Sequence, residues 1–517
     1  MRNITWAIFI VAFILFRPYQ LQSSGMLYID DDQSYVAHAT SLVFLQFPSY
    51  AKESFTVGKG VPLHSIGASL LASPFVFIFS IVDRFLGNDI VMQRNPTNVA
   101  LSWTAFGFVV SSLFYLWATC LLLYLSLRFF FSSWISSLTV MLSVLVEGIP
   151  LFALRRPANA HIYEIFLQSL FIFFLFRVYK VGHILPDKWH FRYWKESALV
   201  GILIGLMFLV RLNNILIALA WPGILFFLYY PKITRKRIFQ MIIISYLFIP
   251  AVFFVFQIWP IFYNLHDIRY YQGYINHPYI KENLLAIQSL DFYFRRFLHL
   301  LWGVDFGLVF SSPYLLLGLI SFLWIKKDRI YKYITLALIP LIVNFYITLS
   351  YRTQGAWYGY RYLIFSLLPV IIYPLAYTFS LLAEKKLRSL FIITIAILII
   401  PLLSMVSFEG NDSNLTLKII DQGFGVADYG NSTYQIEIYK TIYKQPVQYL
   451  FSLFKAGPCY FAYLASLLTG FEGLPAVIYE KYSVFKMSTF IKMAIIYLFP
   501  FLLFIIYKEI ERRKVDG

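Results

Sequence analysis

Apolar runs of about 20 residues recur along the chain and are separated by short polar connections. A run of about 20 residues is the length that crosses the hydrocarbon core of a bilayer as an α-helix. The chain is therefore expected to be an all-α polytopic membrane protein with about 11–13 transmembrane helices. The candidate spans are 4–22, 64–82, 99–127, 133–152, 161–179, 197–211, 212–230, 238–259, 306–325, 333–350, 363–383, 389–408 and 488–507.

Basic residues are concentrated in a few of the connections, which predicts which side each connection faces. Loops rich in Lys and Arg remain in the cytoplasm. The basic connections are 180–196, 231–237, 326–332, 384–388 and the tail after Lys508. The longer connections then face the exterior: 23–62, 260–305, 351–362 and 409–487.

The number of spans conflicts with this orientation in one region, residues 63–179. Four candidate spans would return the chain to the exterior, although the loop at 180–196 should be cytoplasmic. One of the four is therefore not a full crossing. The suspect is 64–82, because it opens with polar residues and ends at Asp83-Arg84.

Three regions divide the expected molecule. Residues 1–408 form a transmembrane catalytic module, whose first exterior loop is 23–62. Residues 409–487 form a small, partly polar exterior cap. Residues 488–517 form a final transmembrane helix and a basic cytoplasmic tail.

Composition supports a membrane protein and excludes a nucleic-acid partner. The chain is 60% hydrophobic and 13% charged, whereas a soluble domain is typically about 25% charged. The net charge is +17, but the basic residues lie in short loops between apolar runs, where they face anionic lipid. Membrane lipids, rather than nucleic acid, are the expected partners of these charges.

Three consecutive carboxylates, Asp30-Asp31-Asp32, follow the first span and precede a helical stretch from Ser34 to Leu45. One interpretation is structural, because Asp at a helix start caps the backbone and complements the helix dipole. The other is a catalytic carboxylate whose pKa is tuned by a like-charged neighbour. Both interpretations can hold together.

Two further groups of charged residues lie at the ends of spans. His161 and Glu164 are three residues apart and share a helix face. A capped helix end with solvated charges is the favoured interpretation, with an acceptor or metal site as the alternative. Arg211 lies between two apolar segments, where a charge is costly and often functional. A position in a tight turn is favoured slightly.

Three stretches together resemble the GT-C superfamily of membrane glycosyltransferases, which includes protein mannosyltransferases and aminoarabinose transferases. The first is Asp31-Asp32-Gln33-Ser34-Tyr35, followed by Lys59 and Pro62. The others are the stretch from Gly201 to Asn213 and the loop from Gly355 to Tyr362. Asp30 is extra to the family pattern.

The resemblance implies that a sugar moves, with inversion, from a polyprenyl-phosphate donor to a hydroxyl acceptor on the exterior face. Asp31 would be the general base, with Asp32 as second choice. Positive charge would stabilise the phosphate leaving group. The candidates for that role are Lys59, Arg361 and Arg352.

Other residues are candidates for binding the acceptor or the sugar: Tyr35, His64, His161, Glu164 and Tyr358. No organic cofactor is expected, and a divalent metal at Asp31 and Asp32 is a candidate whose ion the ligands do not define. The sequence contains no nucleotide-binding fingerprint. That absence agrees with a lipid-linked donor.

The expected location is a bacterial inner membrane, with the active site on the periplasmic face. The acceptor could be a lipid, a glycan or a protein. A lipid-linked oligosaccharide flippase or transporter is one alternative, but it predicts charges inside the spans, which are nearly free of Asp and Glu. An O-antigen polymerase or ligase is another, although those usually place their key loop late in the chain.

Overall fold

A computed structural model describes the helices that surround the candidate site. Isolated residues and short pieces are also described between the main ranges. The main ranges are 31–48, 64–88, 102–145, 157–181, 192–211, 214–229, 234–263, 312–325, 361–385 and 388–394.

Every regular element within these ranges is a helix, as the apolar pattern predicts. The shorter elements are α2 (Asp31–Val43), α6 (Ser133–Val140), α12 (Trp259–Tyr263) and α17 (Pro313–Ser321), with π-helical turns at Met141–Leu145 and Phe254–Ile258. The longer ones are α3 (Gly67–Phe85), α5 (Trp103–Arg128), α8 (Ala160–Val181), α9 (Arg192–Val210), α10 (Ile215–Tyr229), α11 (Arg235–Phe253) and α19 (Arg361–Lys385).

Four of these helices are long and apolar enough to cross a membrane by length and composition. They are Gly67–Phe85, Trp103–Arg128, Ala160–Lys180 and Arg235–Ile258. The all-α polytopic membrane fold is therefore confirmed. The candidate spans 4–22, 333–350 and 488–507 and the cap at 409–487 lie outside the described residues.

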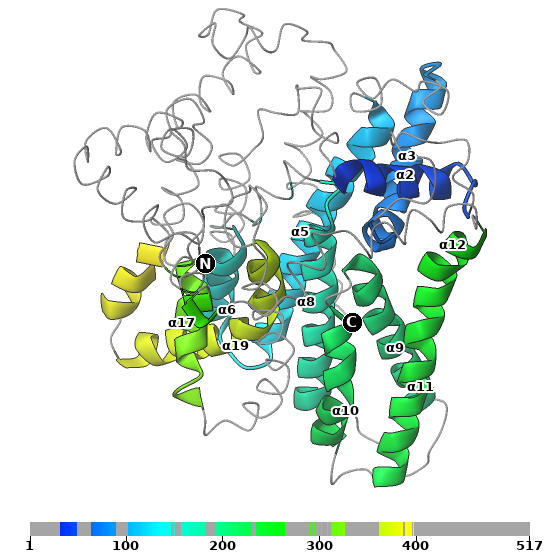
Figure 1. The fold of residues 1–517 in the computed structure, drawn as a ribbon. Helices are drawn as coiled ribbons and strands as arrows, with labels where there is room; N and C mark the ends of the chain where they lie inside the picture. The colour runs from blue at the N-terminus through cyan, green and yellow to red at the C-terminus, as the bar shows by residue number, and fades with distance from the viewer. Residues whose placement is uncertain are drawn as a thin grey trace, which may run out of the picture.

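Helix α8 lies at the centre of the described bundle (Figure 1). Helices α9, α10 and α11 lie on one side of it, and α6, α17 and α19 lie on the other. Helix α9 packs closely on α11 because Gly201 and Gly205 have no side chain: an added Cβ at Gly201 would meet the Ser245 carbonyl oxygen at 2.5 Å. This small-residue packing is typical of membrane helices.

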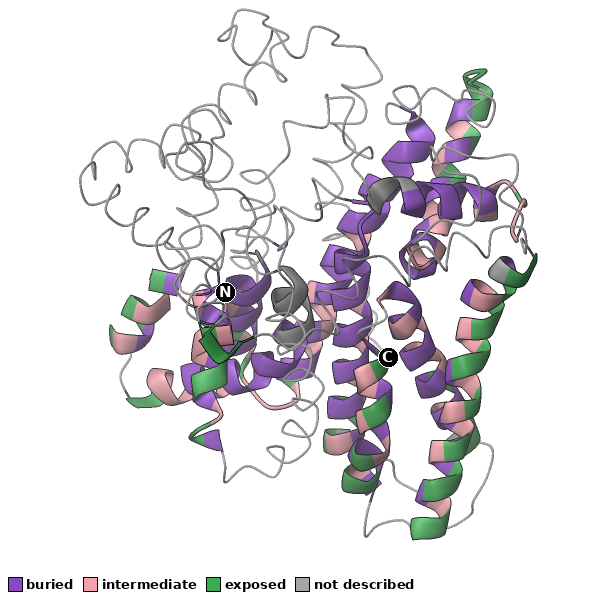
Figure 2. Ribbon diagram, in the orientation of Figure 1, coloured by how far each residue is buried: buried purple, intermediate pink, exposed green. Residues whose placement is uncertain are grey.

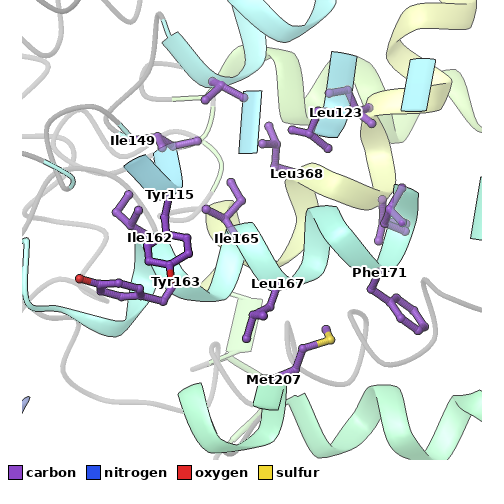
Figure 3. Packing of buried hydrophobic residues seen from close by; sticks show 14 of the residues in the cluster. Tyr115, Leu123, Ile149, Ile162, Tyr163, Ile165, Leu167, Phe171, Met207 and Leu368 are labelled. Atoms are coloured by element: carbon purple, nitrogen blue, oxygen red, sulfur yellow. The ribbon is translucent and has the colours of Figure 1, made fainter. Parts of the chain in front are cut away.

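The core is apolar and aromatic where α5 meets α8. The rings of Tyr115 and Tyr163 lie 5.3 Å apart, and both residues belong to the buried cluster drawn in Figure 3. The Tyr163 hydroxyl is 2.6 Å from the Ser111 hydroxyl, so its polar end has a partner within the core. Figure 2 shows α5 and α8 buried on most faces, whereas α11 exposes its outer face. That face is suited to lipid.

Helix α5 starts at a cap that a distant residue completes. The Ser102 hydroxyl accepts a hydrogen bond from the Ala105 amide at 3.0 Å. The buried Asp83 carboxylate, at the end of α3, accepts from the Thr104 amide at 2.6 Å and from the Thr104 hydroxyl at 2.7 Å. Amides that would lack partners at a helix start are satisfied in this way, and α3 is joined to α5.

Helix α3 extends beyond the end of the α8–α9 pair rather than alongside it (Figure 1). Its first turn contacts the last turn of α9, because Gly67 lies against the backbone of Leu209 and Val210. From there α3 runs antiparallel to α5: Leu71 meets Tyr115 and Phe79 meets Trp103. Gly67–Phe85 nevertheless meets the length and composition of a span, so that 64–82 is not a full crossing stays a prediction.

Candidate functional site

The described part of α2 begins at Asp31, which agrees with the capping interpretation of the acidic cluster and does not test the catalytic one. The side chains of Asp31 and Asp32 lie outside the described part of the structure. Their chemical roles therefore stay predictions. Residues three and four apart share a helix face, so position 31 lies on the same face of α2 as Ser34 and Tyr35.

His64 lies against this face of α2. Its Nδ1 is 3.3 Å from the Ser34 hydroxyl, and its ring centroid is 5.5 Å from that of Tyr35. The backbone carbonyl of His64 also contacts α2, because it accepts a hydrogen bond from the His38 Nε2 at 2.7 Å. The structure thus brings together two of the predicted substrate-binding residues, Tyr35 and His64.

The segment after His64 joins this face to the end of α9. The Ser65 hydroxyl donates to the Val210 carbonyl oxygen at 3.4 Å. A Cβ at Gly67 would lie 2.4 Å from the Leu209 carbonyl carbon, so only glycine permits this approach. The Ile66 amide donates to the Gln257 side chain at 3.2 Å. This segment therefore connects helix α2 to the end of α9.

Arg211 follows the last residue of α9 and pairs with α8. Its Nη1 lies 3.0 Å from the Glu164 Oε2 and 3.2 Å from the His161 Nδ1. His161 and Glu164 are themselves 3.8 Å apart. The Glu164 side chain is 2% exposed, whereas that of Arg211 is 15% exposed. The carboxylate is therefore enclosed, and the guanidinium lies nearer the surface of the site.

Two amides extend this network into the helix bundle. The Asn214 Nδ2 lies 3.4 Å from the Glu164 Oε1 and donates to the Met207 carbonyl oxygen at 2.9 Å. The Gln168 Nε2 donates to the Asn214 Oδ1 at 2.9 Å. The side chains of both amides are buried.

The interpretation of His161 and Glu164 as solvated charges at a helix end is wrong, because both side chains are buried and paired. Arg211 does sit at a turn, as predicted, but its charge is paired with Glu164 across 47 residues of sequence. Burial strengthens this pairing, because a low dielectric magnifies charge interactions and penalises an unpaired charge.

One signal of this network is present in the sequence. His161, Glu164 and Gln168 are spaced i, i+3 and i+7, so they share one face of α8. A polar stripe at that spacing within an apolar helix indicates a polar partner on a neighbouring helix. Nothing in the sequence marks Asn214 as part of a network, because Asn is common in turns, where its side chain bonds to the nearby backbone.

The remaining predicted site residues lie outside what the structure describes. Lys59, Arg352 and Tyr358 are in undescribed segments. Arg361 is the first residue of α19, but its side chain is not described. Among the described residues, no group of three His, Cys, Asp or Glu side chains is arranged to hold a metal ion.

Comparison with known proteins gives similar structures but no sequence relative. No family model and no curated protein match the chain. The archaeal oligosaccharyltransferase AglB of Archaeoglobus fulgidus, solved with an inhibitory peptide and a dolichol-phosphate, has a TM-score of 0.45 at 13% identity, covering 88% of this chain and 55% of that one.

Two further structures of an A. fulgidus oligosaccharyltransferase are similar. The complex with Zn and sulfate has a TM-score of 0.46 at 12% identity, covering 82% of this chain and 57% of that one. The apo form has a TM-score of 0.44 at 13% identity, covering 92% and 59%. The chain thus spans 55% to 59% of the length of these three structures.

Proposed function

We propose that this chain is a membrane glycosyltransferase that moves a sugar from a polyprenyl-phosphate donor to a hydroxyl acceptor, with inversion. One observation carries the proposal. Arg211, held by the buried carboxylate of Glu164, follows the end of α9 that the segment from His64 to Gly67 joins to α2, the helix that carries Asp31. Glycosyl transfer from a phosphate needs a base for the acceptor and a cation for the leaving group.

Asp31 takes the acceptor's proton as the hydroxyl attacks the anomeric carbon, and the bond from that carbon to the phosphate oxygen breaks. A general base contributes about 10²–10⁴-fold to such a step. Tyr35 is buried and packs against the partly exposed ring of His64. His64 contributes to binding the sugar or the acceptor, because aromatic rings offer an apolar face and a polar edge.

Arg211 stabilises the phosphate as negative charge develops on it. A guanidinium presents five N–H donors in a planar fork that matches phosphate oxygens. Glu164 fixes the guanidinium, so little side-chain entropy is lost when the phosphate arrives. Lys59, Arg352 and Arg361 remain proposed as further cations for the same anion. The acceptor, whether lipid, glycan or protein, is left open.

A flippase is the second candidate, because Glu164 belongs to α8, a helix that meets the criteria for a membrane span. Buried ionisable groups in spans often mark transport pathways. However, Glu164 lies in the second turn of α8, near the end of α8 that contacts Arg211, rather than midway along the helix. The position favours a site at one membrane face.

The test is sugar transfer by the purified chain in lipid nanodiscs with a panel of polyprenyl-phosphate sugars. We expect protein-dependent release of polyprenyl phosphate from at least one donor. Asp31→Asn should abolish release, and Arg211→Met should reduce it by about 10²–10³-fold. Glu384→Gln, an exposed position on α19, is the matched control and should leave the rate unchanged.

Full activity in both Asp31→Asn and Arg211→Met would refute this assignment of the site. Movement of an intact lipid-linked glycan between leaflets, with no glycosidic cleavage, would instead establish the flippase function. Both outcomes are read on protein that elutes as a single species, so misfolding is excluded.

A further inference from the structure

The polar network behind Arg211 is a directed chain of hydrogen bonds. Gln168 donates through Nε2 to the Asn214 Oδ1, which orients the Asn214 amide. The Asn214 Nδ2 then faces the Glu164 Oε1, while the Arg211 Nη1 occupies the Glu164 Oε2. Each carboxylate oxygen of Glu164 therefore has its own partner, and the plane of the carboxylate is fixed.

The orientation of the Asn214 amide is set by the groups that its oxygen and its nitrogen contact, of which Gln168 is one. If the Asn214 amide turned over, its Oδ1 would face the Glu164 Oε1, and two acceptors would meet. Only the present orientation lets Asn214 donate to both Glu164 and the Met207 carbonyl oxygen. Gln168 reinforces that orientation by donating to the Asn214 Oδ1, although it touches neither Arg211 nor Glu164 in any hydrogen bond that the described residues show.

Stability alone gives a weak reason for such a network. Gln168 and Asn214 are both 4% exposed and lie among apolar helices. Replacing both members of a buried polar pair with apolar groups of similar shape is often nearly neutral. What the amides add is geometric: they hold a carboxylate, and through it a cation, in one orientation.

We propose that Gln168 and Asn214 are positioning residues that orient Glu164, so that Arg211 is presented at the angle needed to bind a phosphoester. This inference rests on the proposed function, because it assumes that Arg211 binds the donor phosphate. It adds that phosphate affinity depends on an amide lying one turn deeper in α8 than the carboxylate that Arg211 contacts.

The test measures binding of farnesyl phosphate, a short polyprenyl monophosphate, to the full chain in detergent by ligand-induced thermal stabilisation. Farnesol, which lacks the phosphate, is titrated in parallel to report the apolar part of the affinity. The variants are Gln168→Met, Asn214→Leu and Arg211→Met. The matched control is Ser169→Ala, a buried α8 position whose hydroxyl bonds only to the Ile165 carbonyl oxygen within the described residues.

We expect Gln168→Met and Asn214→Leu to weaken farnesyl phosphate binding by about five- to tenfold, the loss that follows from one hydrogen bond. Farnesol binding should be unchanged in both variants, a separation that a merely structural role would not produce. Arg211→Met should bind farnesyl phosphate and farnesol with the same affinity. Ser169→Ala should bind both as the unmodified chain does.

The inference is overturned if Arg211→Met loses phosphate binding while Gln168→Met and Asn214→Leu retain it, and the proposed function then survives. An equal loss of farnesol and farnesyl phosphate in the two amide variants would assign them a structural role and also overturn it. Unchanged phosphate binding in Arg211→Met would refute the proposed function itself. If Gln168→Met does not fold, Gln168→Asn, which withdraws the amide by one methylene, gives the same readout.

Discussion

At the scale of single residues, His38 shows how the fold sets a protonation state. The side chain is buried in α2, and its Nε2 lies 2.7 Å from the His64 carbonyl oxygen. A carbonyl oxygen only accepts, so Nε2 carries the proton of a neutral imidazole. Burial is the main cause that lowers the pKa of His38 from 6.5 to about 4. The neutral ring connects α2 to the segment that carries His64.

This pKa predicts a loss of stability in mild acid. The unfolded chain takes up a proton at His38 near pH 6.5, whereas the folded chain does so only near pH 4. The free energy of unfolding should therefore fall as the pH drops from 6.5 to 4, by about 3 kcal/mol from this group. His38→Gln keeps a donor for the His64 carbonyl oxygen but does not titrate, so its thermal midpoint should depend less on pH. Identical pH profiles for the two proteins would contradict the assignment.

At the scale of helices, the contact between α3 and α9 brings the two halves of the site together. The contact is backbone against backbone, because an added Cβ at Gly67 would meet the Leu209 carbonyl carbon and the Val210 nitrogen at 2.4 Å. Neither neighbour can move aside by a rotamer change. The position of His64 relative to Arg211 therefore depends on one glycine.

Gly67→Ala should destabilise the protein by about 1–3 kcal/mol, the usual cost of overpacking. It should also lower the rate of sugar transfer by more than the loss of folded protein explains, because His64 is displaced from Arg211. Gly318→Ala is the matched comparison: the nearest neighbour of an added Cβ there is the Ile371 Cδ1 at 2.9 Å, the end of a flexible side chain that can shift. The thermal midpoints and the sugar-transfer rates of both variants test this prediction. Equal changes in the two variants would argue against a special role for Gly67.

At the scale of the molecule, the sequence predicted the elements better than their partners. The apolar runs at 99–127 and 161–179 correspond to α5 and α8, with ends shifted by at most a few residues. Length and composition set those helices. The pairing of Arg211 with Glu164 could not be predicted, because it joins two helices through tertiary packing. The side-chain geometry of Asp31 and Lys59 lies outside the described residues, so those roles rest on sequence.

The placement of α3 makes a prediction about sidedness. Because α3 extends away from the α8–α9 pair, Asn88 beyond its end should lie on the same side of the membrane as Leu45 beyond the end of α2. Lys236, in the first turn of α11, lies at the opposite end of the bundle. In a chain without its own cysteines, Leu45→Cys and Asn88→Cys should react with an impermeant maleimide from one side and Lys236→Cys from the other. Labelling of Asn88→Cys together with Lys236→Cys would make α3 a full crossing.

The most direct test of the proposed site is a cryo-EM structure of the chain in nanodiscs with a bound polyprenyl phosphate. We predict that the phosphate lies within hydrogen-bonding distance of the Arg211 guanidinium, with the start of α2 facing the position of the sugar. A phosphate bound instead at the opposite end of the bundle, among Arg235, Lys236 and Arg237, would contradict the proposed site.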